Sequence, residues 1–213
     1  MMSSISKSSV ISLVVLIANP AAALCPFGFG SGAKLPAAHP PVLRNNNAPP
    51  MLPPTEPPAG YTEAMHKLDI DAVQSDLLAL MQDSKPHWPA DYGNYGPFFV
   101  RLAWHCSGTY RATDGRGGCS GGRQRFKPES DWQDNQNLDK ARLLLAPIKE
   151  KYGLGLSWGD LFVMAGTTAI QAMGGPTLGV CVGRVDDEDG SRSEALMPTN
   201  AELKKLTDGK LPR

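Results

Sequence analysis

The sequence predicts an all-α fold. Four segments between residues 68 and 173 carry apolar residues three and four positions apart, the spacing that forms one face of a helix. Each segment is bounded by residue types that start or end helices. No region of the sequence is rich in segments with the pattern of β-strands. We therefore expect one mostly helical domain.

The first two expected helices span residues 68–84 and 97–107. In the first, apolar side chains alternate with charged ones, and Pro86 lies just beyond its end. The second has Pro97 in its first turn, where a missing backbone N–H costs nothing, and Gly108 directly after its last residue. Both segments have the boundaries of short globular helices.

The third expected helix covers residues 138–152, with a bend at Pro147 and a stop at Gly153. Asp134 and Asn135 precede it, and side chains of these types commonly cap helix N-termini. One interpretation of this pair is therefore a cap.

The fourth expected helix covers residues 158–173, and the capping-box pattern from Ser157 to Asp160 opens it. It is apolar on most sides, so we expect it deep in the core. Its small residues, 165–168, would admit another helix or a flat ligand, and packing is the simpler explanation. If the helices that should cover it are absent, it exposes a large apolar surface.

The chain before this domain has the layout of an exported protein. Residues 1–23 carry Lys7, a short apolar stretch and small residues near Ala23, which is typical of a signal peptide. The apolar stretch is too short to span a bilayer. A proline-rich linker follows at 24–60. Secretion is the simpler interpretation, and a two-part plastid address is the alternative.

Composition limits the classes of partner. The 213 residues contain 21 basic and 21 acidic side chains, so bulk charge favours neither nucleic acid nor an anionic membrane surface. The glycine-rich loop at 113–122 lacks the Lys-Ser/Thr ending of a phosphate-binding loop. A partner is therefore expected at a specific site.

The four cysteines show no C-x-x-C spacing, so neither a zinc site nor a thioredoxin-like motif is indicated. Export would permit disulfides. Cys106 is expected to pack as a small buried apolar residue, and Cys119 could pair with any of the others. The spacing does not choose between these pairings.

Arg101, Trp104 and His105 are the candidate functional residues. Positions three and four apart are neighbours on a helix, so a fixed cation, an aromatic ring and an imidazole would share one face. An imidazole exchanges protons near neutral pH. The face is a candidate proton-transfer site, although alone it also fits a solvated Arg–His pair beside a core tryptophan.

Neighbouring runs favour the functional interpretation. Asp-Tyr-Gly-Asn-Tyr-Gly-Pro leads in at 91–97, and further runs follow at 108–111, 114–118, 124–126, 132–142 and 157–161. In uninterrupted order over residues 61–185, they resemble the N-terminal haem domain of the catalase-peroxidases, class I of the plant, fungal and bacterial haem peroxidases. The resemblance implies a haem-peroxidase-like helical domain with haem b as cofactor. It also implies hydrogen peroxide and a small reducing substrate as partners, in oxidative-stress defence, with a homodimer for the complete protein.

The resemblance implies that Arg101, Trp104 and His105 are catalytic on the distal side of the haem. His105 would take a proton from peroxide and return it to the leaving oxygen, while the permanent charge of Arg101 favours the charge that develops there. Asn135 would hydrogen-bond His105, and Asp134 would lie at the access channel. In the family, the tryptophan is cross-linked to a tyrosine and a methionine, for which this sequence offers no matching motif.

The family's proximal histidine, the iron ligand, also has no counterpart, since His39, His66 and His87 all precede His105. We therefore expect the N-terminal, distal half only, at 61–185, followed by a divergent tail at 186–213, in an incomplete chain. The leading interpretation is a haem catalase-peroxidase that reduces hydrogen peroxide. The alternatives are a non-catalytic secreted binding or interaction fragment, and a class I peroxidase without catalase activity.

Overall fold

A computed structural model describes residues 55–110, 116–176 and 179–193. Within these ranges the regular structure is helical, and β pairing is confined to isolated bridges such as Gly121 with Asp186. The all-α prediction is confirmed. The expected signal peptide, nearly all of the proline-rich segment and the chain from residue 194 lie outside the described residues.

The helices follow the predicted segments closely. They are α1 (Tyr61–His66), α2 (Ile70–Gln82), α3 (Gly96–Ser107), α4 (Leu138–Tyr152) and α5 (Trp158–Ala172). The described residues between α3 and α4 include the 3₁₀ turns η2 (Arg123–Arg125), η3 (Glu129–Asp131) and η4 (Gln133–Asn135). The sequence predicted α2, α3, α4 and α5, but it did not predict α1.

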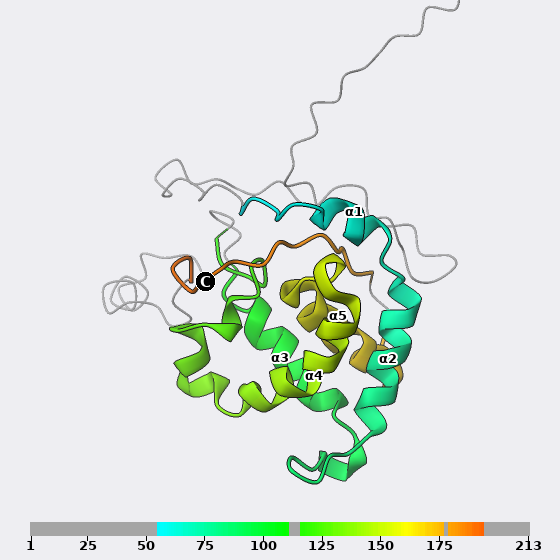
Figure 1. The fold of residues 1–213 in the computed structure, drawn as a ribbon. Coiled ribbons are helices and arrows are strands. Elements are labelled where there is room, and N and C mark those ends of the chain that lie inside the picture. The colour runs from blue at the N-terminus through cyan, green and yellow to red at the C-terminus, as the bar shows by residue number, and fades with distance from the viewer. Residues whose placement is uncertain (1–54, 111–115, 177–178, 194–213) are drawn as a thin grey trace, which may run out of the picture.

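Helix α5 lies at the centre of the fold, in contact with α2, α3 and α4 (Figure 1). Its Leu161, Phe162 and Ala165 are fully buried. Helix α3 approaches it closely at Gly166, where an added Cβ would lie 2.4 Å from the Cβ of Ala103. The small residues of α5 therefore serve helix packing, as the sequence favoured.

The prediction of a large exposed apolar surface on α5 is wrong for the described residues. Most of the helix is buried, and its exposed apolar side chains, Ile170 and the following Met173, lie at its C-terminal end. A more exposed apolar side chain lies on α3, where the ring of Trp104 is 69% exposed. One of the exposed apolar side chains of the described residues, that of Trp104, therefore belongs to the candidate site, whereas others, such as Leu143 on α4, lie outside it.

The start of α5 is held by two carboxylates as well as its cap. Ser157 Oγ accepts a hydrogen bond from the Asp160 N–H at 3.0 Å, as the capping-box pattern predicts. Asp160 accepts hydrogen bonds from Gly183 N–H (2.8 Å) and from the Arg184 guanidinium (2.8 Å). Asp186 accepts from the Trp158 N–H at 2.9 Å. The segment 179–193, orange in Figure 1, is thereby fastened to α5.

The packed part of the chain thus continues through Asp187, past the boundary expected at residue 185.

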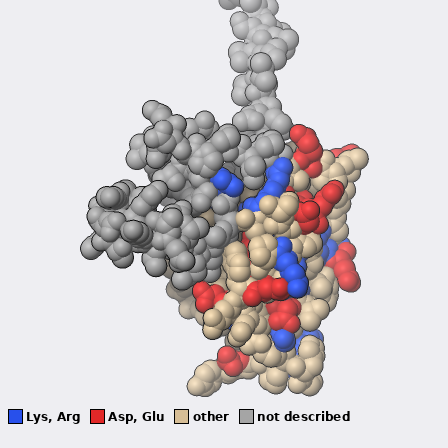
Figure 2. Space-filling view, turned by 90° about the vertical axis from the view of Figure 1, so that its left-hand side faces the viewer, with Lys and Arg blue, Asp and Glu red and all other residues tan. Residues whose placement is uncertain are grey.

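On the described part of one face, basic and acidic side chains are interspersed (Figure 2). Among the described helices, none has the length and apolar character needed to cross a bilayer.

Candidate active site

Helix α3 presents the candidate residues on its outer side. Phe99 and Leu102 are buried against the core, whereas Arg101 and His105 are half-buried and Trp104 is exposed. Residues three and four apart share a helix face. The core packing of α3 therefore leaves a cation, an indole and an imidazole beside one another at its surface.

His105 is held in one orientation by Asn135. Its Nδ1 lies 2.8 Å from Asn135 Oδ1. The Asn135 amide nitrogen donates to the backbone carbonyl of Glu129 at 2.7 Å, and a carbonyl can only accept. The amide oxygen must therefore face the imidazole, so the proton of neutral His105 resides on Nδ1. The Nε2 atom keeps a lone pair with which it can accept a proton.

Arg101 is held by the same short turn. Its Nη2 donates to the backbone carbonyl of Asp134 at 2.6 Å and to that of Gln136 at 3.0 Å. These carbonyls flank Asn135, so turn η4 and the residue after it fix both the guanidinium and the imidazole. Asp134 is exposed and takes part through its backbone.

The interpretation of Asp134 and Asn135 as the cap of the following helix is wrong. Asn137 occupies the cap position of α4, with a left-handed φ of 69° and no side-chain cap bond. The side chain of Asn135 is buried and directed at His105 and Glu129 instead.

Cys106, directly after His105, forms a disulfide with Cys119, and both residues are buried. The expected burial of Cys106 is confirmed, and the disulfide identifies Cys106 as the partner of Cys119 that the spacing left open. The bond fastens the end of α3 to the glycine-rich loop. Cys181 is also disulfide-bonded.

A cavity of about 310 Å³ lies beside Arg101. Trp88 and Phe98 form an aromatic wall, with ring centroids 6.1 Å apart, and Asn94 and Asn137 contribute polar groups. This volume is at the lower end of the range for small-molecule pockets. The cavity can therefore admit one small aromatic molecule next to a charged side chain.

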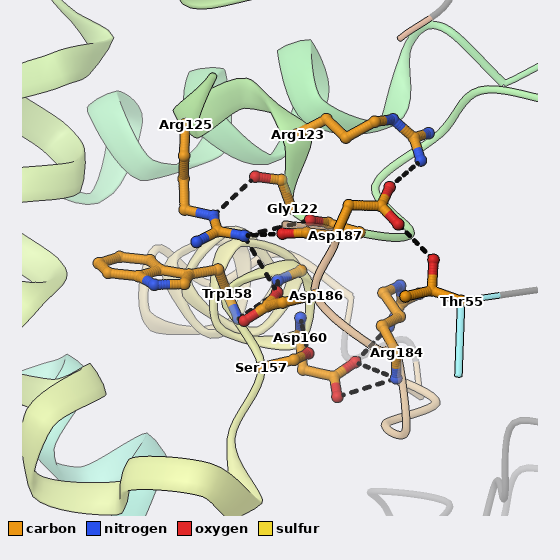
Figure 3. A network of polar contacts seen from close by, with 12 residues as sticks. Thr55, Gly122, Arg123, Arg125, Ser157, Trp158, Asp160, Arg184, Asp186 and Asp187 are labelled. Atoms are coloured by element: carbon orange, nitrogen blue, oxygen red, sulfur yellow. Dashed lines mark hydrogen bonds and ion pairs between the residues drawn. The ribbon is translucent and has the colours of Figure 1, made fainter. Parts of the chain in front are cut away.

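A buried cluster of charged residues, Arg123, Glu129 and Asp187, lies behind this site. Arg123 Nη1 is 2.8 Å from Asp187 Oδ2, and Arg123 Nε is 3.5 Å from Glu129 Oε1. Burial raises the pKa of the Glu129 carboxyl, and Ser193 and then Arg123 offset part of this. Figure 3 shows Arg123 and Asp187 meeting across the loop. This cluster could not be predicted from the sequence, because Asp187 lies far along the chain from Arg123 and Glu129.

Together these groups suit acid–base chemistry on a small molecule. A neutral imidazole with a free Nε2 can accept a proton and later return it. A guanidinium beside it keeps its charge at every relevant pH and can stabilise negative charge on a reacting oxygen. The fold and the site therefore define a helical domain with a candidate proton-transfer face.

The family profile described as Peroxidase matches residues 73–209. This span is more than half of the chain and contains every residue of the candidate site. The chain belongs to the peroxidase family.

Individual relatives narrow the resemblance to catalase-peroxidases. The catalase-peroxidase of Sphingopyxis alaskensis is 61% identical over 126 residues, which are 59% of this chain and 17% of the relative. That of Caulobacter vibrioides is 54% identical over 166 residues, 76% of this chain and 23% of the relative. Catalase-peroxidase 1 of Haloarcula marismortui is 62% identical over 126 residues. The chain spans less than a quarter of the length of the first two.

The described residues fit one side of a haem. The exposed indole of Trp104, beside Arg101 and His105, is the kind of surface that a flat, largely apolar group would cover. The other histidines in the described ranges, His66 and His87, are exposed and belong to other elements. Within those ranges no cluster of His, Cys, Asp and Glu side chains could hold a metal ion. The fit therefore concerns the face of α3 that carries Arg101, Trp104 and His105.

Proposed function

We propose that this chain supplies the distal side of a haem-dependent catalase-peroxidase that reduces hydrogen peroxide. The observation that carries the proposal is the contact between His105 Nδ1 and Asn135 Oδ1, which leaves Nε2 as a proton acceptor on an exposed face. Membership of the peroxidase family supports it. The proposed cofactor is haem b, which when bound supplies the iron that exchanges electrons with peroxide.

His105 would act first as base and then as acid. Its Nε2 takes a proton from the peroxide oxygen nearer the haem and returns it to the oxygen that leaves as water. The Nδ1–H contact with Asn135 holds the ring during both transfers. Arg101 places a fixed positive charge beside the leaving oxygen, while the exposed Trp104 ring supplies an apolar surface for the cofactor.

Titration of haemin into the purified chain tests the first requirement. Imidazole is added as an iron ligand, and the Soret band is followed. We expect saturable binding with one haem per chain, weakened by Trp104→Ala. Tyr92→Ala is the matched control, because Tyr92 is a fully exposed aromatic residue outside α3. Absence of saturation, or equal binding by the Trp104 variant, would contradict the proposal and favour a non-catalytic interaction fragment.

The proposed second substrate is a small reducing molecule. The cavity beside Arg101, with the Trp88 and Phe98 rings in its wall, supports this assignment because aromatic walls favour flat organic molecules. Steady-state peroxidase assays with phenol as the electron donor test it. A raised KM for phenol in Phe98→Ala, without a change in the reaction with peroxide, is the expected result. An unchanged KM would contradict it.

We also propose that the protein is secreted. The buried disulfide between Cys106 and Cys119 supports this, because such bonds persist mainly in oxidising compartments. Expression of the chain fused at its C-terminus to a reporter shows whether it reaches the medium. Retention of the reporter inside a plastid would favour the two-part address instead.

A further inference from the structure

The charged cluster of Arg123, Glu129 and Asp187 joins three segments that are separate in sequence. Arg123 begins turn η2 directly after the glycine-rich loop, Glu129 begins η3, and Asp187 lies in the segment after α5. All three are at most 7% exposed. Arg123 donates from Nη1 to Asp187 and from Nη2 to the carbonyl of Gly118 at 3.3 Å. One guanidinium therefore ties the loop to the end of the described fold.

Local geometry keeps Asp187 in this position. Its backbone N–H donates to the Gly121 carbonyl at 2.9 Å, and its Oδ1 accepts from the hydroxyl of Thr55. Gly121 has a φ of 88°, and an added Cβ would lie 2.1 Å from Asp187 Oδ2. The glycine therefore permits the close approach that lets the carboxylate reach Arg123 (Figure 3).

Glu129 connects this cluster to the proton-transfer site. Its side chain faces Arg123, whereas its backbone carbonyl accepts the hydrogen bond from the Asn135 amide. The glycine-rich loop, which directly precedes Arg123, is bonded through Cys119 to Cys106, the residue after His105. The cluster is thus linked to His105 on two sides, through Asn135 and through the end of α3.

Stability alone is a weak reason for such a cluster. Removing charges from water costs free energy that their mutual attraction often only balances, so apolar residues would hold the same segments at least as well. A buried charge that loses its partner must rearrange to find water, and the neighbouring backbone moves with it.

We propose that Arg123 and Asp187 are positioning residues that fix the tautomer and orientation of His105 by holding Glu129 and, through it, Asn135. Their effect on the imidazole exists without any cofactor. Its consequence for catalysis rests on the proposed function.

The test is the 15N spectrum of the histidine ring nitrogens in the chain without haem, which distinguishes protonated from unprotonated nitrogens. His105→Gln identifies the His105 signals. In the unaltered chain, we expect neutral His105 to be protonated at Nδ1. In Asp187→Asn, we expect a mixture of both tautomers, and exchange of the Nδ1 proton about tenfold faster, the factor for losing one hydrogen bond of ordinary net strength.

Two controls separate positioning from general loss of stability. Asp189→Asn removes an exposed carboxylate from the same segment, and Leu77→Ala destabilises the core at α2, far along the chain from the cluster. Both should keep the spectrum of the unaltered chain. Arg123→Lys, which keeps the charge and loses the fork that reaches both carboxylates, should resemble Asp187→Asn.

An unchanged His105 spectrum in folded Asp187→Asn and Arg123→Lys would overturn the proposal. So would loss of the folded state in both variants, because the cluster would then have only a structural role. Because no haem is present, failure here is distinguishable from failure of the proposed function, which the haemin titration reports.

Discussion

Asn135 uses both ends of its side chain, and this makes it the residue on which the geometry of His105 depends most. The amide oxygen meets the imidazole and the amide nitrogen meets the Glu129 carbonyl, with the whole side chain buried. Buried polar groups without partners cost far more than paired groups gain. At the scale of single residues, the site is therefore a set of satisfied hydrogen bonds that tolerates few exchanges.

Asn135→Ala should destabilise the chain by about 1–3 kcal/mol, because it leaves the Glu129 carbonyl without its partner in a buried place. Urea unfolding followed by circular dichroism measures the change. Gln133→Ala, at an exposed position of the same turn, is the control and should change little. Equal stabilities for the two variants would show that the Asn135 hydrogen bonds contribute nothing to folding.

Glu129 makes the stability of the folded chain depend on pH, and the direction of this dependence follows from the shift in its pKa. Burial raises the pKa of its carboxyl in the folded chain. Its contribution to stability is therefore complete below the unfolded value, about 4.3, and is lost as pH rises through the folded pKa.

Glu129→Gln, which cannot ionise, should therefore be more stable than the unaltered chain at neutral pH, and the difference should shrink toward acid pH. Unfolding free energies measured between about pH 4 and pH 8 test this. Glu188→Gln, at an exposed neighbour of Asp187, is the matched control. A loss of stability at neutral pH would mean that the pair with Arg123 outweighs the cost of burial.

At the scale of elements, periodicity and end signals predicted α2 to α5 to within about two residues, because each of these helices buries one face or stripe. The shared face of Arg101, Trp104 and His105 follows from the same geometry. The partner of Cys119 and the ion pair of Arg123 with Asp187 did not follow, since both depend on how distant segments meet. Asn135 before α4 suggested a cap, but tertiary contacts directed its side chain elsewhere.

The contact between α3 and α5 leads to a prediction at this scale. Gly166→Ala places a methyl group 2.4 Å from the Ala103 Cβ, so overpacking should cost about 1–3 kcal/mol. Ala103→Gly in the same chain should restore part of the loss. Chemical denaturation of the two single variants and the double variant measures the coupling. Simple additivity of the single effects would show that the helices separate rather than clash.

At the scale of the whole molecule, three segments converge behind the candidate site, and the last of them is distant from the other two in sequence. The glycine-rich loop, the turns before α4 and the segment after α5 are joined by the disulfide, the charged cluster and the hydrogen bonds of Asp160 and Asp186. Figure 3 shows the contacts of Asp160 and Asp186 at the start of α5. The order of the α3 face that carries Arg101 and His105 is therefore a property of the packed chain and not of α3 alone.

Replacing both Cys106 and Cys119 by alanine should cost about 2–4 kcal/mol, since the bond closes a loop across a sequence separation of 13 residues. Variants test this better than a reducing agent, which would also act on the disulfide of Cys181. Thermal and urea unfolding of the double variant provide the value. A change within about 0.5 kcal/mol, the range of ordinary surface substitutions, would show that the unfolded chain gains little freedom.

The role proposed for His105 is that of the acid–base group in a peroxide-reducing haem site. Its most direct test is the second-order rate of reaction of the haem-loaded protein with hydrogen peroxide, compared between the unaltered protein and His105→Leu. We predict that the substitution lowers this rate by about 100- to 10,000-fold, the usual contribution of general acid–base catalysis, with haem binding retained. A His105→Leu protein that binds haem and reacts with peroxide at the unaltered rate would contradict the claim.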